Sequence, residues 1–207
     1  SPDQLGVVAQ LLHAIEQHGR FPTALLAVIA TLIQKAAAKQ PGVPAFRSIG
    51  LLPALYRVWA KCRQPLAKAW EADHPRPFLC HQKGRSIAEL VFQQALVPEA
   101  AKAAGHEAHS AAILWDMSDY YEHVRRRTLW QRAESTKFPL TILSVVLNQH
   151  QAPRFVSHEG STVLAGHPGQ GLAAGDPFDT YLVQVYTIEP IDTWQAEHKL
   201  LPLSLFI

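Results

Sequence analysis

The sequence predicts a mixed fold of helices and strands (α/β, in the α+β arrangement), from three kinds of pattern. Apolar residues recur at helical spacing in residues 3–18 and 51–71. A short apolar run at 111–115 ends at Asp116, which is typical of a buried strand. Two β-rich runs flank His158-Glu-Gly160, as in a β-hairpin. With 207 residues, 48% of them hydrophobic, the chain can bury one sizeable core or two small ones.

Charge and cysteine content exclude several classes of protein. Lys and Arg number 19 against 17 for Asp and Glu, so any site for a polyanion must be a local patch. The two cysteines form neither a disulfide framework nor a zinc-ligand pattern, which indicates reduced thiols in an intracellular protein. The apolar run 23–33 ends at Lys35, too short for the roughly 20 residues of a membrane span.

In the first half of the chain, the helix over 3–18 is expected to stop at Gly19. Helix and strand both fit residues 22–39, and residues 40–44 form a turn. The helix over 51–71 is broken by His74-Pro-Arg-Pro77. Ser86 and Glu89 form a capping box for a helix that reaches about Ala104.

In the second half, the strand that ends at Asp116 precedes helices over 124–134 and 139–150. The hairpin pairs 154–157 with 161–164, and residues 166–171 form a flexible loop. A long helix is expected from that loop towards His198, and residues 203–207 are expected to form a strand.

The acid at the end of the central strand has two interpretations. A carboxylate there lies where sheet gives way to loop, the usual place for a metal-binding acid in a site of this class. The alternative is that Asp116 caps the next helix, and Asp119 has the same alternative.

The order of five sequence blocks resembles the reverse transcriptase domain of non-LTR (LINE-like) retrotransposons, over nearly the whole chain. Residues 30–35 are similar to the family's LIPK segment, 46–57 to RPISLLPxLYR, and 83–90 to RKGRSTxDxL. Residues 115–122 resemble LDVSKAFD, the first palm motif, and 166–182 resemble GVPQGSxLSPxLFxxYL. Gly50 replaces a serine, Glu122 replaces an aspartate, and Gly169 is inserted between the proline and the glutamine.

The resemblance implies a right-hand polymerase fold, with fingers over residues 1–109 and a truncated palm over 110–207. It implies an RNA-directed DNA polymerase that uses an RNA template, a DNA primer and deoxynucleoside triphosphates, with a nuclear location. Two Mg²⁺ ions bridged by carboxylates would activate the primer 3′-hydroxyl and stabilise the leaving pyrophosphate. The resemblance also implies an antiparallel palm sheet that pairs the Asp116 strand with residues 203–207, with helices on one face.

The resemblance also implies the residues of the site. Asp116 is the catalytic and metal-binding carboxylate, and the Met117 carbonyl is a further Mg²⁺ ligand. Tyr121 lies under the incoming sugar, where its ring would exclude a ribose 2′-hydroxyl. The residues expected at the triphosphate or the templating base pair are Lys83, Arg85, Arg47, Gln170 and Gly171.

Each of these residues also has a structural interpretation. Tyr121 would simply pack in the core, Lys83 and Arg85 would form a solvated basic turn, and Gln170 would be an ordinary loop residue. Residues 125–127, three arginines, are interpreted as a solvated helix start with some phosphate contact.

The family's third palm motif, an Asp-Asp pair, would follow Ile207, so residues 1–207 alone are expected not to polymerise. A non-catalytic nucleic-acid-binding remnant of such an element is the alternative function. A helical interaction domain unrelated to polymerases is a third.

Overall fold

The structure is a computed structural model that describes residues 2–34, 46–79, 86–105, 117, 119–199, 203 and 205. Those residues form seven α-helices and one four-stranded sheet, which confirms the predicted mixture of helices and strands. The chain divides into two compact units, Ser1–Trp70 with Asp119–Thr187, and Glu71–Ser118 with Ile188–Ile207. The expected division into fingers and palm at residue 109 remains a prediction.

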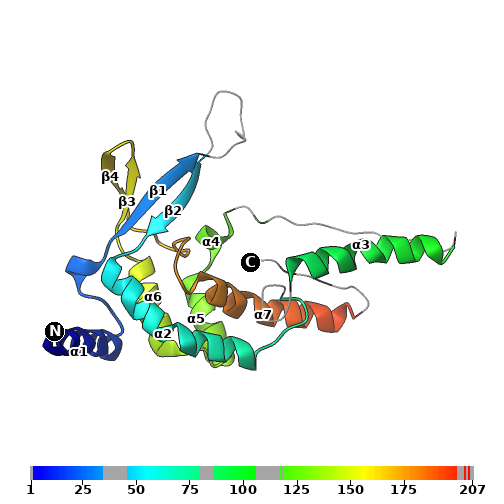
Figure 1. Ribbon diagram of the computed structural model, residues 1–207, viewed down its shortest axis with the longest axis horizontal. Coiled ribbons are helices and arrows are strands. Elements are labelled where there is room, and N and C mark those ends of the chain that lie inside the picture. Colours follow the sequence, from blue (N-terminus) through cyan, green and yellow to red (C-terminus); the bar gives the residue numbers. More distant parts are fainter. Residues whose placement is uncertain are drawn as a thin grey trace. The chain divides into compact units, whose positions relative to one another are not determined.

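The first unit contains a mixed sheet with the strand order β2-β1-β3-β4 (Figure 1). The strands are β1 Val28–Gln34, β2 Phe46–Leu51, β3 Arg154–His158 and β4 Ser161–Gly166. β1 pairs antiparallel with β2 and parallel with β3. β3 and β4 form the predicted hairpin, with positive φ at both Glu159 and Gly160 as a tight primed turn requires. Strands from the first quarter of the sequence and from beyond its midpoint therefore form one sheet.

The ambiguous segment 22–39 resolves as a strand where it is described. A 3-10 turn at Thr23–Leu25 leads into β1, whose residues include Val28, Ile29 and Ile33. These β-branched side chains fit a pleated surface better than a helix. Partners on both sides of β1 also satisfy its backbone, so tertiary pairing decides what local pattern leaves open.

The helices follow the predicted order, except that the short helix at Tyr120–His123 was not predicted. Their bounds are α1 Pro2–His18, α2 Ala54–Asp73, α3 Ile87–Ala103, α4 Tyr120–His123, α5 Arg126–Ser135, α6 Leu140–His150 and α7 Asp179–Glu197. α1 stops at Gly19 as expected, because this glycine takes a φ of +64° that other residues adopt reluctantly. α2 begins at Ala54 rather than Leu51, since β2 extends through Leu51.

The prediction of a helix running on from the 166–171 loop is wrong, because α7 begins only at Asp179. Gly171 and Gly175 have φ values of +81° and +107°, which no right-handed helix contains. Pro177 lies two residues before the helix and has no N–H for a preceding turn. Residues 172–178 are therefore an irregular segment, most of it buried.

The core of the first unit is built on an aromatic cluster. Trp59 lies 5.6 Å from Tyr56, 6.1 Å from Phe21 and 5.8 Å from Phe178, measured between ring centroids. All four side chains are almost fully buried. Aromatic contacts at these separations add to the free energy of burial, and here they tie α2 to the residues just before α7.

The second unit has fewer described residues. Ser86 accepts a hydrogen bond from the Glu89 amide at 3.0 Å, so the predicted cap of α3 is confirmed. Arg76 binds Asp192 through its Nε at 2.9 Å, and Leu205 forms an isolated parallel bridge with Leu79. The expected pairing of residues 203–207 with the Asp116 strand lies outside the described residues. Among the described helices, none has the length and apolar character to cross a membrane.

Candidate functional site

The segment 171–176 is the meeting point of stretches that lie far apart in the sequence. Gly171 donates its amide hydrogen to the Val124 carbonyl at 2.9 Å, and Leu172 donates to the Tyr121 carbonyl at 2.8 Å. On its other side, the Ala174 carbonyl accepts a hydrogen bond from Gly50 of β2 at 2.8 Å. The segment is therefore held between the sheet and the residues around α4.

Two glycines make this close approach possible. A Cβ atom on Gly171 would lie 2.7 Å from the Glu122 carbonyl oxygen, inside the distance that real Cβ atoms keep. A Cβ atom on Gly175 would lie 3.0 Å from the Gly50 carbonyl oxygen. Both glycines also have positive φ, so both backbone conformation and available space select glycine at these positions.

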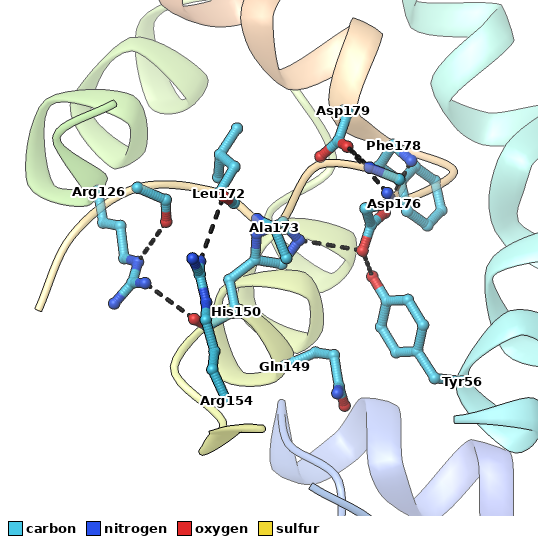
Figure 2. Close-up of polar contacts among 12 residues, drawn as sticks. Tyr56, Arg126, Gln149, His150, Arg154, Leu172, Ala173, Asp176, Phe178 and Asp179 are labelled. Atoms are coloured by element: carbon cyan, nitrogen blue, oxygen red, sulfur yellow. Dashed lines mark hydrogen bonds and ion pairs between the residues drawn. The ribbon is translucent and has the colours of Figure 1, made fainter. Parts of the chain in front are cut away.

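A buried hydrogen-bond network fixes the end of this segment, and Figure 2 shows Tyr56 and His150 both directed at Asp176. Tyr56 donates its hydroxyl hydrogen to Asp176 Oδ2 at 2.5 Å, and His150 Nε2 lies 3.0 Å from the same oxygen. His150 Nδ1 accepts a hydrogen bond from the Ala173 amide at 2.7 Å. The ring hydrogen of neutral His150 must therefore reside on Nε2, where it is donated to Asp176.

Asp179 lies beside this network with its carboxyl group almost fully buried. Its Oδ2 accepts hydrogen bonds from the Gly175 and Asp176 amides, each at 2.8 Å. Its Oδ1 is buried and has no hydrogen-bond partner among the described residues. Burial and the nearby charge of Asp176 raise the pKa of Asp179 to about 8, so this carboxyl group holds a proton at neutral pH.

His150, Asp176 and Asp179 place one ligand-type atom each within 4.8 Å of one another, close enough for a metal ion. Their hydrogen bonding fits a metal poorly. A metal on His150 Nε2 would put the ring hydrogen on Nδ1, against the N–H of Ala173. The group is better described as a hydrogen-bonded clasp, formed by Tyr56, His150, Asp176 and Asp179.

Two arginines hold the other end of the segment (Figure 2). Arg126 donates to the carbonyls of Gly171, Pro168, His150 and Gln170 at 2.9, 2.9, 2.8 and 3.1 Å. Arg154 donates from Nη2 to the Leu172 carbonyl at 3.2 Å.

The interpretation of Arg126 as part of a solvated helix start is therefore wrong, whereas Arg125 and Arg127 are exposed as expected.

The structure brings together three of the residues predicted for the nucleotide site: Tyr121, Gln170 and Gly171. Tyr121 is half-buried. Its pKa is raised mainly by burial and to a smaller extent by the charge of Asp179. Gln170 is exposed, and Gly171 is buried against Glu122.

The other predicted residues are placed only in part. The backbone of Arg47 lies on β2 opposite Ile33, and the structure does not describe its side chain. Met117 is 53% exposed. Lys83, Arg85 and Asp116 lie outside the described residues, so the expected Mg²⁺ site stays a prediction.

Sequence reasoning missed the clasp and the role of Arg126. One signal was present: Gly175-Asp-Pro-Phe-Asp179 places two acids around a proline just before a long helix, a pattern typical of side chain-to-backbone hydrogen bonds. No local sequence pattern identifies Tyr56 or His150 as members of the clasp, because their shared partner, Asp176, lies far from both in the sequence. No model of a known protein family matches this chain, and no curated protein matches it.

Proposed function

We propose that this chain is part of a reverse transcriptase, an RNA-directed DNA polymerase that uses two Mg²⁺ ions in the intact protein. One observation carries the proposal. Described residues of three of the five blocks that resemble the non-LTR family meet in the first unit: Gly50 of block 46–57 donates to Ala174 of block 166–182, and Leu172 of that block donates to Tyr121 of block 115–122. Blocks with a common function are expected to converge on one site.

The geometry suits the role proposed for Tyr121. The backbone of Gly171 lies against Glu122, with no room for a side chain between them. This backbone, bonded through the Leu172 amide to the carbonyl of the half-buried Tyr121, would be a suitable support for a base and its sugar. The Tyr121 ring would exclude a ribose 2′-hydroxyl and so favour deoxynucleotides.

The spacing of the glycines also allows a second register for the block at 166–182. The family pattern has two glycines separated by three residues, and Gly171 and Gly175 have that spacing. In this register the pattern's later tyrosine falls on Tyr186, and the loop needs no insertion. Ala174 then replaces the glutamine, and Gln170 precedes the block.

The replacement of that glutamine by Ala174 favours the second candidate function, a remnant that binds nucleic acid without turnover. Both functions predict binding of an RNA–DNA hybrid that weakens steeply with salt, because phosphate contacts release counterions. Only the polymerase predicts a site that distinguishes deoxy from ribo triphosphates.

The experiment titrates the 207-residue chain with a fluorescent RNA–DNA primer–template, then with dUTP or UTP in the presence of Mg²⁺. We expect the hybrid to bind, and dUTP to bind at least about tenfold more tightly than UTP, a difference of about 1.4 kcal/mol. Tyr121→Val should remove this preference, whereas Tyr121→Phe should retain it, because only the first removes the ring. Binding of the hybrid without nucleotide selectivity supports the remnant, and failure to bind the hybrid refutes both functions.

A further inference from the structure

Arg126 and Arg154 donate hydrogen bonds to two consecutive carbonyl groups of the segment whose Leu172 amide is bonded to the Tyr121 carbonyl. Figure 2 shows the two arginine side chains beside Leu172 and His150. Arg126 Nε holds the Gly171 carbonyl, and Arg154 Nη2 holds the Leu172 carbonyl. The other N–H groups of Arg126 connect the loop to the carbonyl of His150, the last residue of α6. One side chain thus joins the start of α5, the end of α6 and the loop.

The position of Arg126 in its own helix does not explain its presence. It is the first residue of α5, where the positive end of the helix dipole makes a cation unfavourable. The His150 carbonyl, by contrast, lies at the negative end of α6, where a cation is favourable. The favourable interactions of the Arg126 side chain are therefore those with α6 and the loop, and not those with its own helix, α5.

The two guanidinium groups also place positive charge behind the loop. Both are half-buried, and burial lowers the pKa of each. The charge of Arg154 further lowers the pKa of Arg126, whereas the charge of Glu122 acts in the opposite direction on Arg154. Carbonyl oxygens satisfy hydrogen bonds without cancelling charge, so both guanidinium groups bring positive charge to the loop, which favours an anionic ligand.

Every polar backbone atom from the Gly171 amide to the Ala173 amide has a hydrogen-bond partner. The Gly171 and Leu172 amides bind the Val124 and Tyr121 carbonyls, and the Ala173 amide binds His150 Nδ1. The two carbonyls between these amides are the ones that the arginines hold. A backbone fixed at every polar atom is the preorganised surface that a binding pocket needs.

We propose that Arg126 and Arg154 are positioning residues that clamp Gly171–Leu172 against Tyr121, and that they supply positive charge which attracts a nucleoside triphosphate to that surface. The ligand part rests on the proposed function. The clamp itself rests on the hydrogen bonds alone.

The clamp is tested by amide hydrogen exchange on the 207-residue chain. Arg126→Lys keeps the charge, but one ammonium group cannot reach four carbonyls spread over two segments. We expect exchange of the Gly171 and Leu172 amides to become at least about tenfold faster, with the α6 amides unchanged. Arg127 is a neighbouring exposed arginine in the same helix, so Arg127→Lys should change exchange neither at Gly171 and Leu172 nor in α6.

Arg154→Lys is the milder variant, because it removes one hydrogen bond, and it should accelerate exchange mainly at Leu172 and Ala173. It keeps the test decisive if Arg126→Lys reduces folding. Unchanged exchange at Gly171 and Leu172 in both variants would overturn the clamp. So would an increase spread evenly over the first unit, since that would mean a general contribution to stability.

Nucleotide affinity is the second readout, measured with dUTP and Mg²⁺. A displaced Gly171–Leu172 segment should weaken binding by about ten- to a hundredfold in Arg126→Lys, although net charge is unchanged. If the wild-type chain binds dUTP and the loosened variant binds it equally well, the positioning role is wrong. If the wild-type chain binds no nucleotide, the proposed polymerase function and the ligand role fail together, and the exchange result alone decides the clamp.

Discussion

Tyr56 of α2 and Asp176 of the segment before α7 share a buried hydrogen bond of 2.5 Å. Burial and the charge of Asp176 raise the pKa of Tyr56 well above its ordinary value, so the tyrosine acts as a neutral donor. The bond joins the aromatic cluster to the candidate site, since Tyr56 also contacts Trp59. Stability of the core and geometry of the site therefore depend on one contact.

Tyr56→Phe should destabilise the chain by about 1.5–3 kcal/mol, the range for a hydrogen bond to a charged group. The ring stays in place, so packing around Trp59 is unchanged. Urea denaturation measures the loss. In an Asp176→Asn background the same substitution should cost clearly less, and equal costs in the two backgrounds would show that the hydroxyl acts elsewhere.

Gly171→Ala should destabilise the chain far more than Gly160→Ala. The two glycines have nearly equal φ, +81° and +80°, so the strain of a left-handed alanine is matched. Only at Gly171 does the added Cβ meet backbone, at 2.7 Å from the Glu122 oxygen, whereas nothing lies within 4 Å of Gly160. We expect about 1 kcal/mol for Gly160→Ala and at least about 3 kcal/mol for Gly171→Ala, measured by thermal denaturation.

Asp179 should make the chain less stable as pH rises from about 4 to about 8. Its pKa is raised from 3.8 to about 8, so between these values the folded chain holds a proton that the unfolded chain has released. Stability then falls by up to about 1.4 kcal/mol per pH unit, and this contribution becomes constant above pH 8.

Asp179→Asn, which cannot ionise, should flatten the dependence on pH, as measured by urea denaturation at a series of pH values. Asp3→Asn, a change at an exposed acid in α1, is the control and should leave the slope as it is. An unchanged slope in Asp179→Asn would mean that this carboxyl group is ionised in the folded chain at neutral pH.

Glu16 should contribute stability with the opposite dependence on pH. Hydrogen bonds from Arg63, with a further one from Trp59 at 2.8 Å, lower its pKa. The contribution is present above the ordinary pKa of a glutamate and disappears as pH falls through the lowered value.

Glu16→Gln should cost about 1 kcal/mol at pH 7, a modest figure because the Arg63 side chain is 40% exposed. The cost should shrink towards pH 2 in chemical denaturation. Glu197→Gln, at an exposed position of α7, should cost nothing measurable at either pH.

Local signals in the sequence predicted much of the fold. Gly19 ends α1, Ser86 caps α3, and Gly160 lies in the turn of the hairpin, because each signal acts within a few residues of itself. The start of α7 was predicted too early, since the apolar pattern before Asp179 is that of a buried irregular segment. Burial gives the same pattern whether or not the backbone is helical.

The site was predictable only where a family pattern named its residues. Tyr121 and Gly171 were expected near one another from the resemblance, and their segments do lie side by side. Tyr56, His150 and Arg126 acquire their roles from partners far away in the sequence. No periodicity or spacing encodes such contacts, because they exist only after the sheet and helices have assembled.

The parallel pairing of β1 with β3 sets an order of events during synthesis. Val28–Gln34 leaves the ribosome long before Arg154–His158, and until then only β2 can pair with β1. Ribosomes add about 5–20 residues per second, so roughly ten seconds separate the two strands. During that interval one edge of an apolar strand is open to pairing with other chains. Nascent chains of this protein should therefore depend on chaperones that bind extended apolar segments until β3 has emerged.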